Sequence, residues 1–132
     1  MTAAAHALAA LGAYLADLRI EERREGFLRA SAVVREDCPV LRGHFPGRPI
    51  LPGAFHVWIA GLLAAHLLAE GQIPRLYAVE KARFRRPLTP RDRITVTVKA
   101  AGEAGHLSVR CRIEKDGDEA SRFHLSLERQ GP

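Results

Sequence analysis

The sequence has few of the residues that support disulfide, metal or base-stacking chemistry. Its 132 residues include 2 cysteines, and aromatic residues make up 6% of the chain. Cys38 and Cys111 stand in neither a Cys-x-x-Cys nor another metal-ligand spacing, so we expect reduced thiols and no structural disulfide. No aromatic residues alternate with the arginines, as a surface for single-stranded nucleic acid requires. These absences argue against a metal centre and against a nucleic-acid partner.

Long uninterrupted hydrophobic runs are also missing. The longest apolar run, residues 54–68, contains two histidines and a glycine and is shorter than the ~20 residues of a membrane span. The apolar N-terminus lacks the basic residues of a secretory signal and contains Asp17. We therefore predict an amphipathic helix over about residues 3–18. Together these features predict a cytoplasmic protein with no membrane partner.

What remains is the composition of an ordinary globular domain. The chain is 47% hydrophobic and 27% charged, and its length suits one hydrophobic core. We predict a single domain over residues 1–132. The net charge of +5, from 20 Lys and Arg against 15 Asp and Glu, favours association with acidic partners but does not choose among them.

The hydrophobic pattern predicts a strand over residues 27–34 and a turn-rich segment over residues 37–53. Three prolines and two glycines between residues 46 and 53 exclude regular helix or central strand there. Residues 54–70 predict a helix that is apolar nearly all round, and hence buried on most of its surface. This buried helix precedes an antiparallel meander, which predicts an α+β fold with the sheet wrapped around the helix. The further strands are expected at residues 75–84, 93–101, 107–116 and 119–128.

Two motifs resemble one family. Residues 43–53 read Gly-His-Phe-Pro-Gly-Arg-Pro-Ile-Leu-Pro-Gly, and residues 79–90 read Val-Glu-Lys-Ala-Arg-Phe-Arg-Arg-Pro-Leu-Thr-Pro. The first resembles the active-site loop of the β-hydroxyacyl-ACP dehydratases of type II fatty-acid synthesis. The second resembles that family's strand–Arg-Phe-x-x-Pro–turn segment, at the family's spacing. The resemblance covers about residues 26–129 and leaves the expected N-terminal helix outside.

The resemblance implies a hotdog fold, in which an antiparallel sheet wraps a long central helix and sheet edges form a dimer. In that family the active site lies at the dimer interface. A histidine of one subunit removes the α-proton of a 3-hydroxyacyl thioester, and an acid on the central helix of the other protonates the departing hydroxide. The implied partner is an acyl carrier protein with a phosphopantetheine-linked substrate. Because the chemistry is proton transfer alone, no metal or organic cofactor is expected.

The chemistry of dehydration assigns roles to particular residues. Removing a carbon-bound proton and expelling hydroxide requires a base, an acid and a donor to the enolate oxygen. His44 is the predicted base. The backbone N–H of Gly53, at the start of the buried helix, is the predicted donor, and the helix dipole adds favourable potential there. We predict that Phe45, Pro52 and Trp58 contact the substrate.

The sequence departs from the family at the acid. The family's Glu or Asp stands fourteen positions after the histidine, and here that position is Trp58. No carboxylate occurs on the predicted helix before Glu70. His56 points roughly 160° away from Trp58 around the helix, so it is not an obvious substitute. Trp58 either packs in the core or an interface, or fills the pocket where the acid and part of the acyl chain would lie.

Three functions remain open. The favoured one is a subunit that contributes His44 to a site shared with an acid-bearing dehydratase paralogue, in a polyketide or specialised fatty-acid pathway. The second is a homodimer that works through His44 alone, as a dehydratase or a double-bond isomerase. The third is a non-catalytic protein that binds or scaffolds acyl thioesters. A hotdog thioesterase is weaker, because no carboxylate stands where it would activate water.

The remaining polar residues have plainer interpretations. His56 and His66 are expected to be hydrogen-bonded helix histidines, because they are ten residues apart rather than at the i, i+4 spacing of a helical metal pair. Cys111 is expected in the core. One basic cluster is either a solvated surface or a docking site for an acidic carrier protein. It comprises Arg83, Arg85, Arg86, Arg91 and Arg93.

Overall fold

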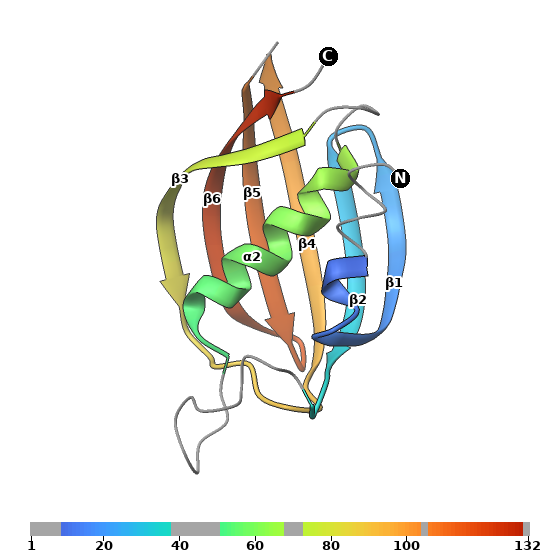
Figure 1. Cartoon of the computed structure of the whole chain (residues 1–132). Helices are drawn as coiled ribbons and strands as arrows, with labels where there is room; N and C mark the ends of the chain where they lie inside the picture. The colour runs from blue at the N-terminus through green and yellow to red at the C-terminus, as the bar shows by residue number, and fades with distance from the viewer. Residues whose placement is uncertain (1–8, 38–50, 68–72, 104–105, 131–132) are drawn as a thin grey trace.

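The computed structural model describes residues 9–37, 51–67, 73–103 and 106–130. In these ranges one antiparallel sheet curves around one helix (Figure 1). This confirms the expected α+β hotdog fold. The helix is α2, Gly53–Ala64, continued by the short 3-10 helix η2, Ala65–Leu67. The strands are β1 (Leu15–Arg24), β2 (Phe27–Val34), β3 (Ile73–Phe84), β4 (Arg93–Glu103), β5 (His106–Lys115) and β6 (Asp118–Gln130).

The strand order is β1-β2-β4-β5-β6-β3. The expected meander is correct for β4, β5 and β6, which pair in sequence order. It is wrong for β3, which pairs with β6 and forms one edge of the sheet. Residues 85–92 carry the chain past the start of α2, from that edge to the middle of the sheet (Figure 1).

The expected N-terminal helix over residues 3–18 is wrong from residue 12 onward. Residues 9–11 are helical, residues 12–14 form a turn, and β1 begins at Leu15. The alanine- and leucine-rich segment has high helix propensity, but tertiary pairing overrides it. β1 pairs with β2 along its whole length and turns into it at Gly26, whose φ is 68°. Residues 1–8 of the expected helix lie outside the described ranges.

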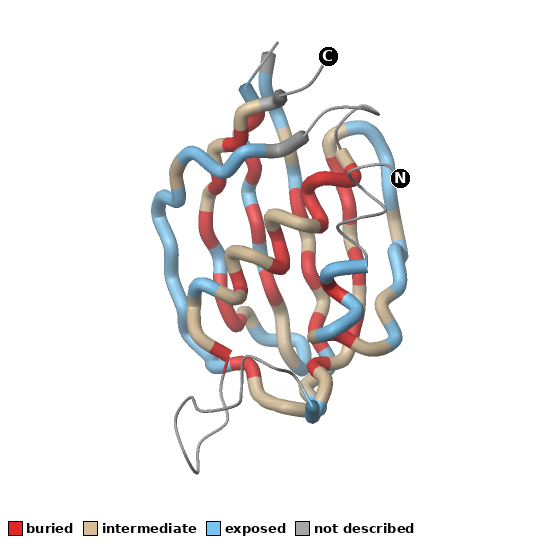
Figure 2. Tube along the Cα trace, in the orientation of Figure 1, coloured by how far each residue is buried: buried red, intermediate tan, exposed pale blue. Residues whose placement is uncertain are grey.

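The core lies between α2 and the concave face of the sheet (Figure 2). Within α2 only Ala54 is exposed, in agreement with the expectation that this helix is buried on most of its surface. On β5 every second residue from Leu107 to Ile113 is buried, which is the period of a strand with one face in the core. The outward residues of the sheet are therefore free to take part in other contacts.

Candidate functional site

The two sequence motifs meet at the start of α2. The buried residues Leu51 and Leu88 form an antiparallel bridge, in which the Leu51 N–H donates to the Leu88 carbonyl at 2.7 Å. The ring of Phe84 covers Gly53 so closely that a Cβ on this glycine would lie 3.1 Å from it. The end of the first motif is thus held against the second, although some thirty residues separate them in sequence.

No side chain of the described residues caps the N-terminus of α2. Pro52 is the N-cap residue, with extended φ and ψ of −65° and 158°, and no acidic residue lies in the first turn. The first N–H groups of a helix have no partner within the helix, and they lie at the positive end of its dipole. The geometry at Gly53 therefore suits a carbonyl oxygen on which negative charge develops.

The predicted site residues fall into three groups. Pro52 and Gly53 lie together at the start of α2. Trp58 lies further along the helix. His44 and Phe45 fall outside the described residues, so their roles as base and substrate contact stay predictions.

Trp58 belongs to an aromatic cluster with the N-terminal turn. Its ring centroid is 5.0 Å from that of Tyr14, in an edge-on arrangement, and 5.0 Å from that of Phe55. Tyr14 and Phe55 are themselves 4.8 Å apart. Trp58 is half-buried and packs against the core. These contacts favour the interpretation that Trp58 packs against its neighbours. An aromatic side chain, rather than a carboxylate, occupies this position of the helix.

Tyr14 is a contact that the sequence did not predict. It lies in the turn before β1, in a segment for which the pattern predicted continuous helix. The aromatic side chain among apolar neighbours was the available signal. The turn at residues 12–14 directs Tyr14 towards Phe55 and Trp58 on α2. The local sequence pattern does not reveal this turn.

His56 faces the opposite side of α2 and is deeply buried. Its Nδ1 lies 2.7 Å from the hydroxyl oxygen of Ser121 on β6, and its ring is edge-on to Phe84 at 5.3 Å. Burial lowers the pKa of His56 to about 4, so the imidazole is neutral near neutral pH. When the Ser121 hydroxyl donates to Nδ1, the imidazole proton is on Nε2. The expectation that His56 is a hydrogen-bonded helix histidine is confirmed.

His66 differs from His56. It is buried in η2, and its backbone carbonyl accepts a hydrogen bond from Arg23. Within the described residues its Nε2 atom has no hydrogen-bond partner, contrary to the expectation of a satisfied side chain. Burial, with a smaller contribution from the Arg23 charge, lowers the pKa of His66.

The described ranges contain neither a metal site nor a membrane-spanning helix. These residues contain no group of three or more His, Cys, Asp or Glu side chains arranged to hold a metal ion. None of the helices in the same ranges is long and apolar enough to cross a membrane.

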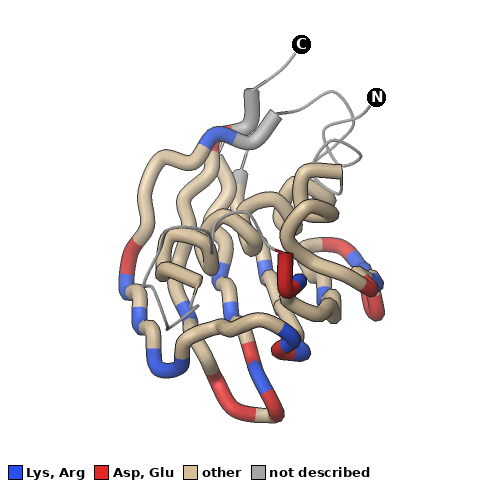
Figure 3. The backbone as a smooth tube through the Cα atoms, turned by 60° about the horizontal axis from the view of Figure 1, so that its bottom comes forward, with Lys and Arg blue, Asp and Glu red and all other residues tan. Residues whose placement is uncertain are grey.

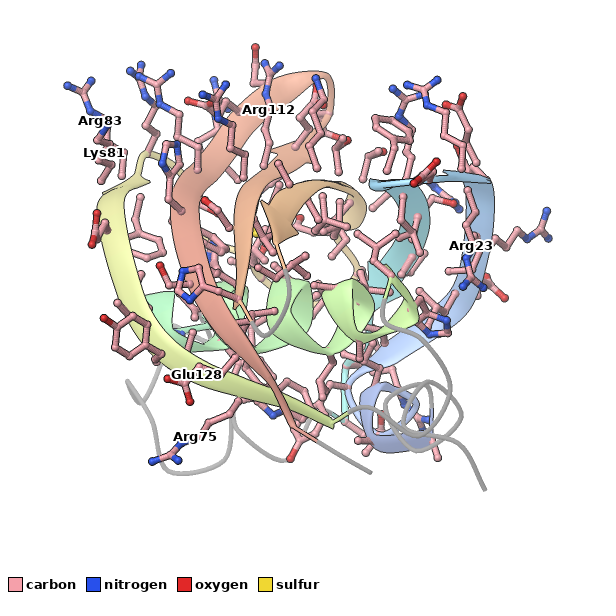
Figure 4. All side chains as sticks on the ribbon, turned by 90° about the horizontal axis from the view of Figure 1, so that it is seen from above. Arg23, Arg75, Lys81, Arg83, Arg112 and Glu128 are labelled. Atoms are coloured by element: carbon pink, nitrogen blue, oxygen red, sulfur yellow. The ribbon has the colours of Figure 1, made fainter. Side chains whose placement is uncertain are left out.

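The basic cluster predicted from the sequence is divided in the structure. Arg85 and Arg86, where the chain leaves β3, pair with acidic residues beside the β5–β6 turn, in the region where Figure 3 shows acidic and basic segments side by side. Arg83 instead points outward from β3 (Figure 4). Three of the five arginines form ion pairs: Arg85 with Glu119 at 3.3 Å, Arg86 with Asp118 at 3.0 Å and Arg91 with Glu36 at 2.6 Å.

Comparison with known families and relatives gives a consistent result. A family model described as ApeI-like, ApeI dehydratase, matches residues 20–123 and so includes part of β1. The 3-hydroxyacyl-[acyl-carrier-protein] dehydratase FabZ of Mannheimia succiniciproducens is 32% identical over 120 residues, which are 85% of this chain and 80% of the relative. FabZ of Sodalis glossinidius is 36% identical over 92 residues, or 64% of this chain. That match spans 61% of the Sodalis protein.

Solved structures show the same fold. The dehydratase heterocomplex ApeI:P from Xenorhabdus doucetiae superposes with a TM-score of 0.71 at 24% identity, and the match covers 84% of this chain and 95% of that one. The PaaI protein of the E. coli phenylacetic acid degradation operon superposes with a TM-score of 0.69 at 20% identity. That match covers 96% of this chain and 91% of PaaI. At these identities the two structures establish a common architecture.

Proposed function

This chain belongs to the ApeI-like dehydratase family, and we propose that it is one subunit of a 3-hydroxyacyl-ACP dehydratase. A partner subunit supplies the acid. The observation that carries the proposal is the contrast along α2. The helix begins at an N-terminus that no described side chain caps and that suits a polarised carbonyl. Trp58, in an aromatic cluster, stands where the family has its acid.

In the proposed reaction His44 takes the α-proton of the 3-hydroxyacyl thioester. The Gly53 N–H donates to the thioester oxygen as the enolate forms. The partner's acid gives a proton to the 3-hydroxyl group, which leaves as water while the double bond forms. Phe45 and Pro52 contact the acyl group. An acyl carrier protein presents the substrate on its phosphopantetheine arm, in a cytoplasmic fatty-acid or polyketide pathway.

The β3 edge supports the proposal that a second chain completes the site. An edge strand presents unpaired backbone groups to which another strand can add, and β3 also exposes large apolar side chains. These are Leu76 (50% exposed), Tyr77 (64%), Val79 (41%) and Phe84 (48%). Since Phe84 contacts Gly53, a chain paired with β3 would lie next to the start of α2. The similar fold from Xenorhabdus doucetiae was solved as a heterocomplex.

The test is an assay of this chain alone and of this chain coexpressed with an acid-bearing dehydratase paralogue. Dehydration of 3-hydroxyacyl-ACP and hydration of enoyl-ACP are both followed. We expect turnover only in the pair, and a loss of about 10²–10⁴-fold with His44→Ala, the typical contribution of a general base. His6→Ala, outside the matched region, is the control and keeps full activity.

Two other results would contradict the proposal. Turnover by the chain alone that depends on His44 would assign a homodimeric dehydratase or isomerase that needs no partner acid. Binding of acyl-ACP without turnover, by the chain alone and by every pair, would assign a non-catalytic acyl-thioester binding protein.

A further inference from the structure

The face of the sheet turned away from α2 carries a row of arginines. Cross-strand register aligns Arg29 on β2 with Thr97 on β4, and Thr97 with Arg112 on β5. Arg112 in turn is opposite Arg122 on β6, which is opposite Arg83 on β3. Residues directly opposite in an antiparallel sheet point to the same face. Arg83 and Arg112, with Lys81, accordingly extend from the side of the sheet away from the helix (Figure 4).

A second row of basic residues lies beside the first. Lys99 on β4 is opposite Arg110 on β5, which is opposite His124 on β6. The two rows are two residues apart along each strand, or about 7 Å. Both rows and Lys81 line one cleft of about 770 Å³. We call this surface the arginine face, and it consists of Arg29, Lys81, Arg83, Lys99, Arg110, Arg112 and Arg122.

Much of this positive charge is not neutralised within the described chain. Glu119 forms ion pairs with Arg112 at 3.4 Å and with Arg122 at 3.7 Å, and Arg29 is 3.3 Å from Glu22. The other four cations make no ion pair with any described residue. They are Lys81, Arg83, Lys99 and Arg110.

Like charges directly opposite each other destabilise a sheet. Three such pairs occur on this face: Lys99 with Arg110, Arg112 with Arg122 and Arg83 with Arg122. They do not help the isolated chain to fold. An anion bound from outside would turn the repulsion into a favourable interaction, because one carboxylate can accept hydrogen bonds from two guanidinium groups.

The spacing and surroundings of the rows fit an acidic helix. Strands lie about 4.8 Å apart, so a row from β2 to β3 spans roughly 19 Å, the length of a helix of about 13 residues. Carboxylates at positions i, i+3 and i+4 of a helix are about 5–6 Å apart, close to the strand spacing. Phe27 lies on this face, but the guanidinium groups of Arg24 and Arg29 cover its ring and leave the residue 5% exposed. Base stacking needs exposed rings, and Phe123 is buried in the core on the other side of the sheet. Glu114 and Glu119 border the cleft. Their negative charges would repel a polyanion that extended beyond the cleft along the strand direction.

We propose that the arginine face binds an acidic helix of a protein partner, laid across the strands from β2 to β3. This face lies on the side of the sheet away from α2, and most of its residues are on β2, β4, β5 and β6 rather than on the edge strand β3. The proposal therefore does not depend on dehydratase activity, and the test measures binding rather than turnover.

The probe is a stapled helical peptide of about 13 residues, labelled with a fluorophore, with glutamates confined to one helical face. Binding is followed by fluorescence anisotropy at low and at high salt. We expect binding that weakens with salt, since the contacts are between exposed charges. The double variant Lys99→Glu/Arg110→Glu is expected to raise Kd by at least about ten-fold, because it reverses two of the unpaired charges.

The matched control is Arg75→Glu/Arg86→Glu, which makes the same change in net charge. Arg75 lies near the start of β3, outside the cleft and far from Arg83 and Arg112 (Figure 4). Arg86 is paired with Asp118. This variant is expected to keep Kd within about two-fold of the wild type. Thermal melting confirms that both variants are folded, and Arg110→Gln provides a milder second test.

Four results would overturn the proposal. One is no binding of the peptide at low salt. The second is an equal loss of affinity in the matched control. The third is equal binding of a peptide of the same composition with its glutamates spread around the helix. The fourth is tighter binding of an oligothymidylate or of anionic phospholipid vesicles, lost in the same double variant, which would assign the face to nucleic acid or lipid.

Discussion

At the scale of single residues, the buried imidazole of His56 gives the clearest pH dependence. Its pKa is lowered from 6.5 to about 4 by burial, so the unfolded chain binds a proton that the folded chain does not. Above pH 6.5 the titration of His56 therefore costs no free energy of unfolding. The free energy of unfolding decreases as the pH falls from 6.5 towards 4. At 1.36 kcal/mol per pKa unit the loss approaches about 3 kcal/mol.

Urea denaturation from neutral to mildly acidic pH measures this loss. His56→Gln keeps a polar side chain for Ser121 but has no titrating group, so the variant is expected to lose less stability over the same range. The loss that arises from His66, whose pKa is also lowered, remains in both proteins. Parallel pH profiles for the two proteins would show that His56 does not cause the effect.

A second prediction at this scale concerns the thiol of Cys111. Burial raises its pKa to about 12, and the thiolate is the form that reacts with alkylating agents. We expect iodoacetamide to leave Cys111 unmodified in the folded protein at mildly alkaline pH and to modify it readily in urea. Mass spectrometry of the peptide that contains Cys111 distinguishes the two states. Equal labelling rates in the folded and unfolded protein would contradict the burial of this residue.

At the scale of elements, the β4–β5 pair contains a testable repulsion. Lys99 and Arg110 are directly opposite and both exposed. Lys99→Glu would place opposite charges across the strands and is expected to stabilise the protein by about 0.2–1 kcal/mol, towards the lower end because the pair is solvated. Adding Arg110→Glu to Lys99→Glu places two negative charges opposite each other and should remove this gain. Urea denaturation of the single and the double variant at low salt measures both effects. A loss of stability in Lys99→Glu would contradict the predicted repulsion.

The elements also separate what the sequence could predict from what it could not. The five strands from β2 to β6 were expected within one or two residues, because alternating burial leaves a local pattern. The start of α2 was expected from the prolines and glycines before it. β1 was missed because its first residues favour helix and only pairing with β2 makes them a strand. The place of β3 beyond β6 depends on a crossover that no local pattern records.

The candidate site shows the same division. Gly53 was predicted correctly as the start of a helix. Its contact with Phe84, and the packing of Trp58 on Tyr14, join segments distant in sequence. The sequence identified the missing carboxylate but not the aromatic cluster that occupies its place. Such contacts follow from the folded arrangement of whole elements rather than from the period of any one of them.

At the scale of the whole molecule, the start of α2 and the β3 edge adjoin each other, because Phe84 contacts Gly53. The arginine face lies on the side of the sheet away from α2 (Figures 1 and 4), and only Lys81 and Arg83 join it to β3. Lys99 and Arg110, on β4 and β5, are remote from the β3 edge. Substitutions at these two residues therefore test the arginine face without altering the edge strand.

The two edges of the sheet provide a matched test of assembly. Val79 on β3 is 41% exposed, and Ile20 on β1, at the opposite edge, is 38% exposed. If β3 pairs with a second chain, Val79→Lys buries a charge at that interface, which is costly unless the charge is paired. We expect it to weaken the complex by at least about ten-fold, or 1.4 kcal/mol. Ile20→Lys introduces the same charge at an edge that stays in solvent, so it should leave association unchanged.

Analytical ultracentrifugation of each variant with its partner decides between the edges. Dissociation by Ile20→Lys but not by Val79→Lys would move the interface to β1, and with it the partner's acid away from Gly53.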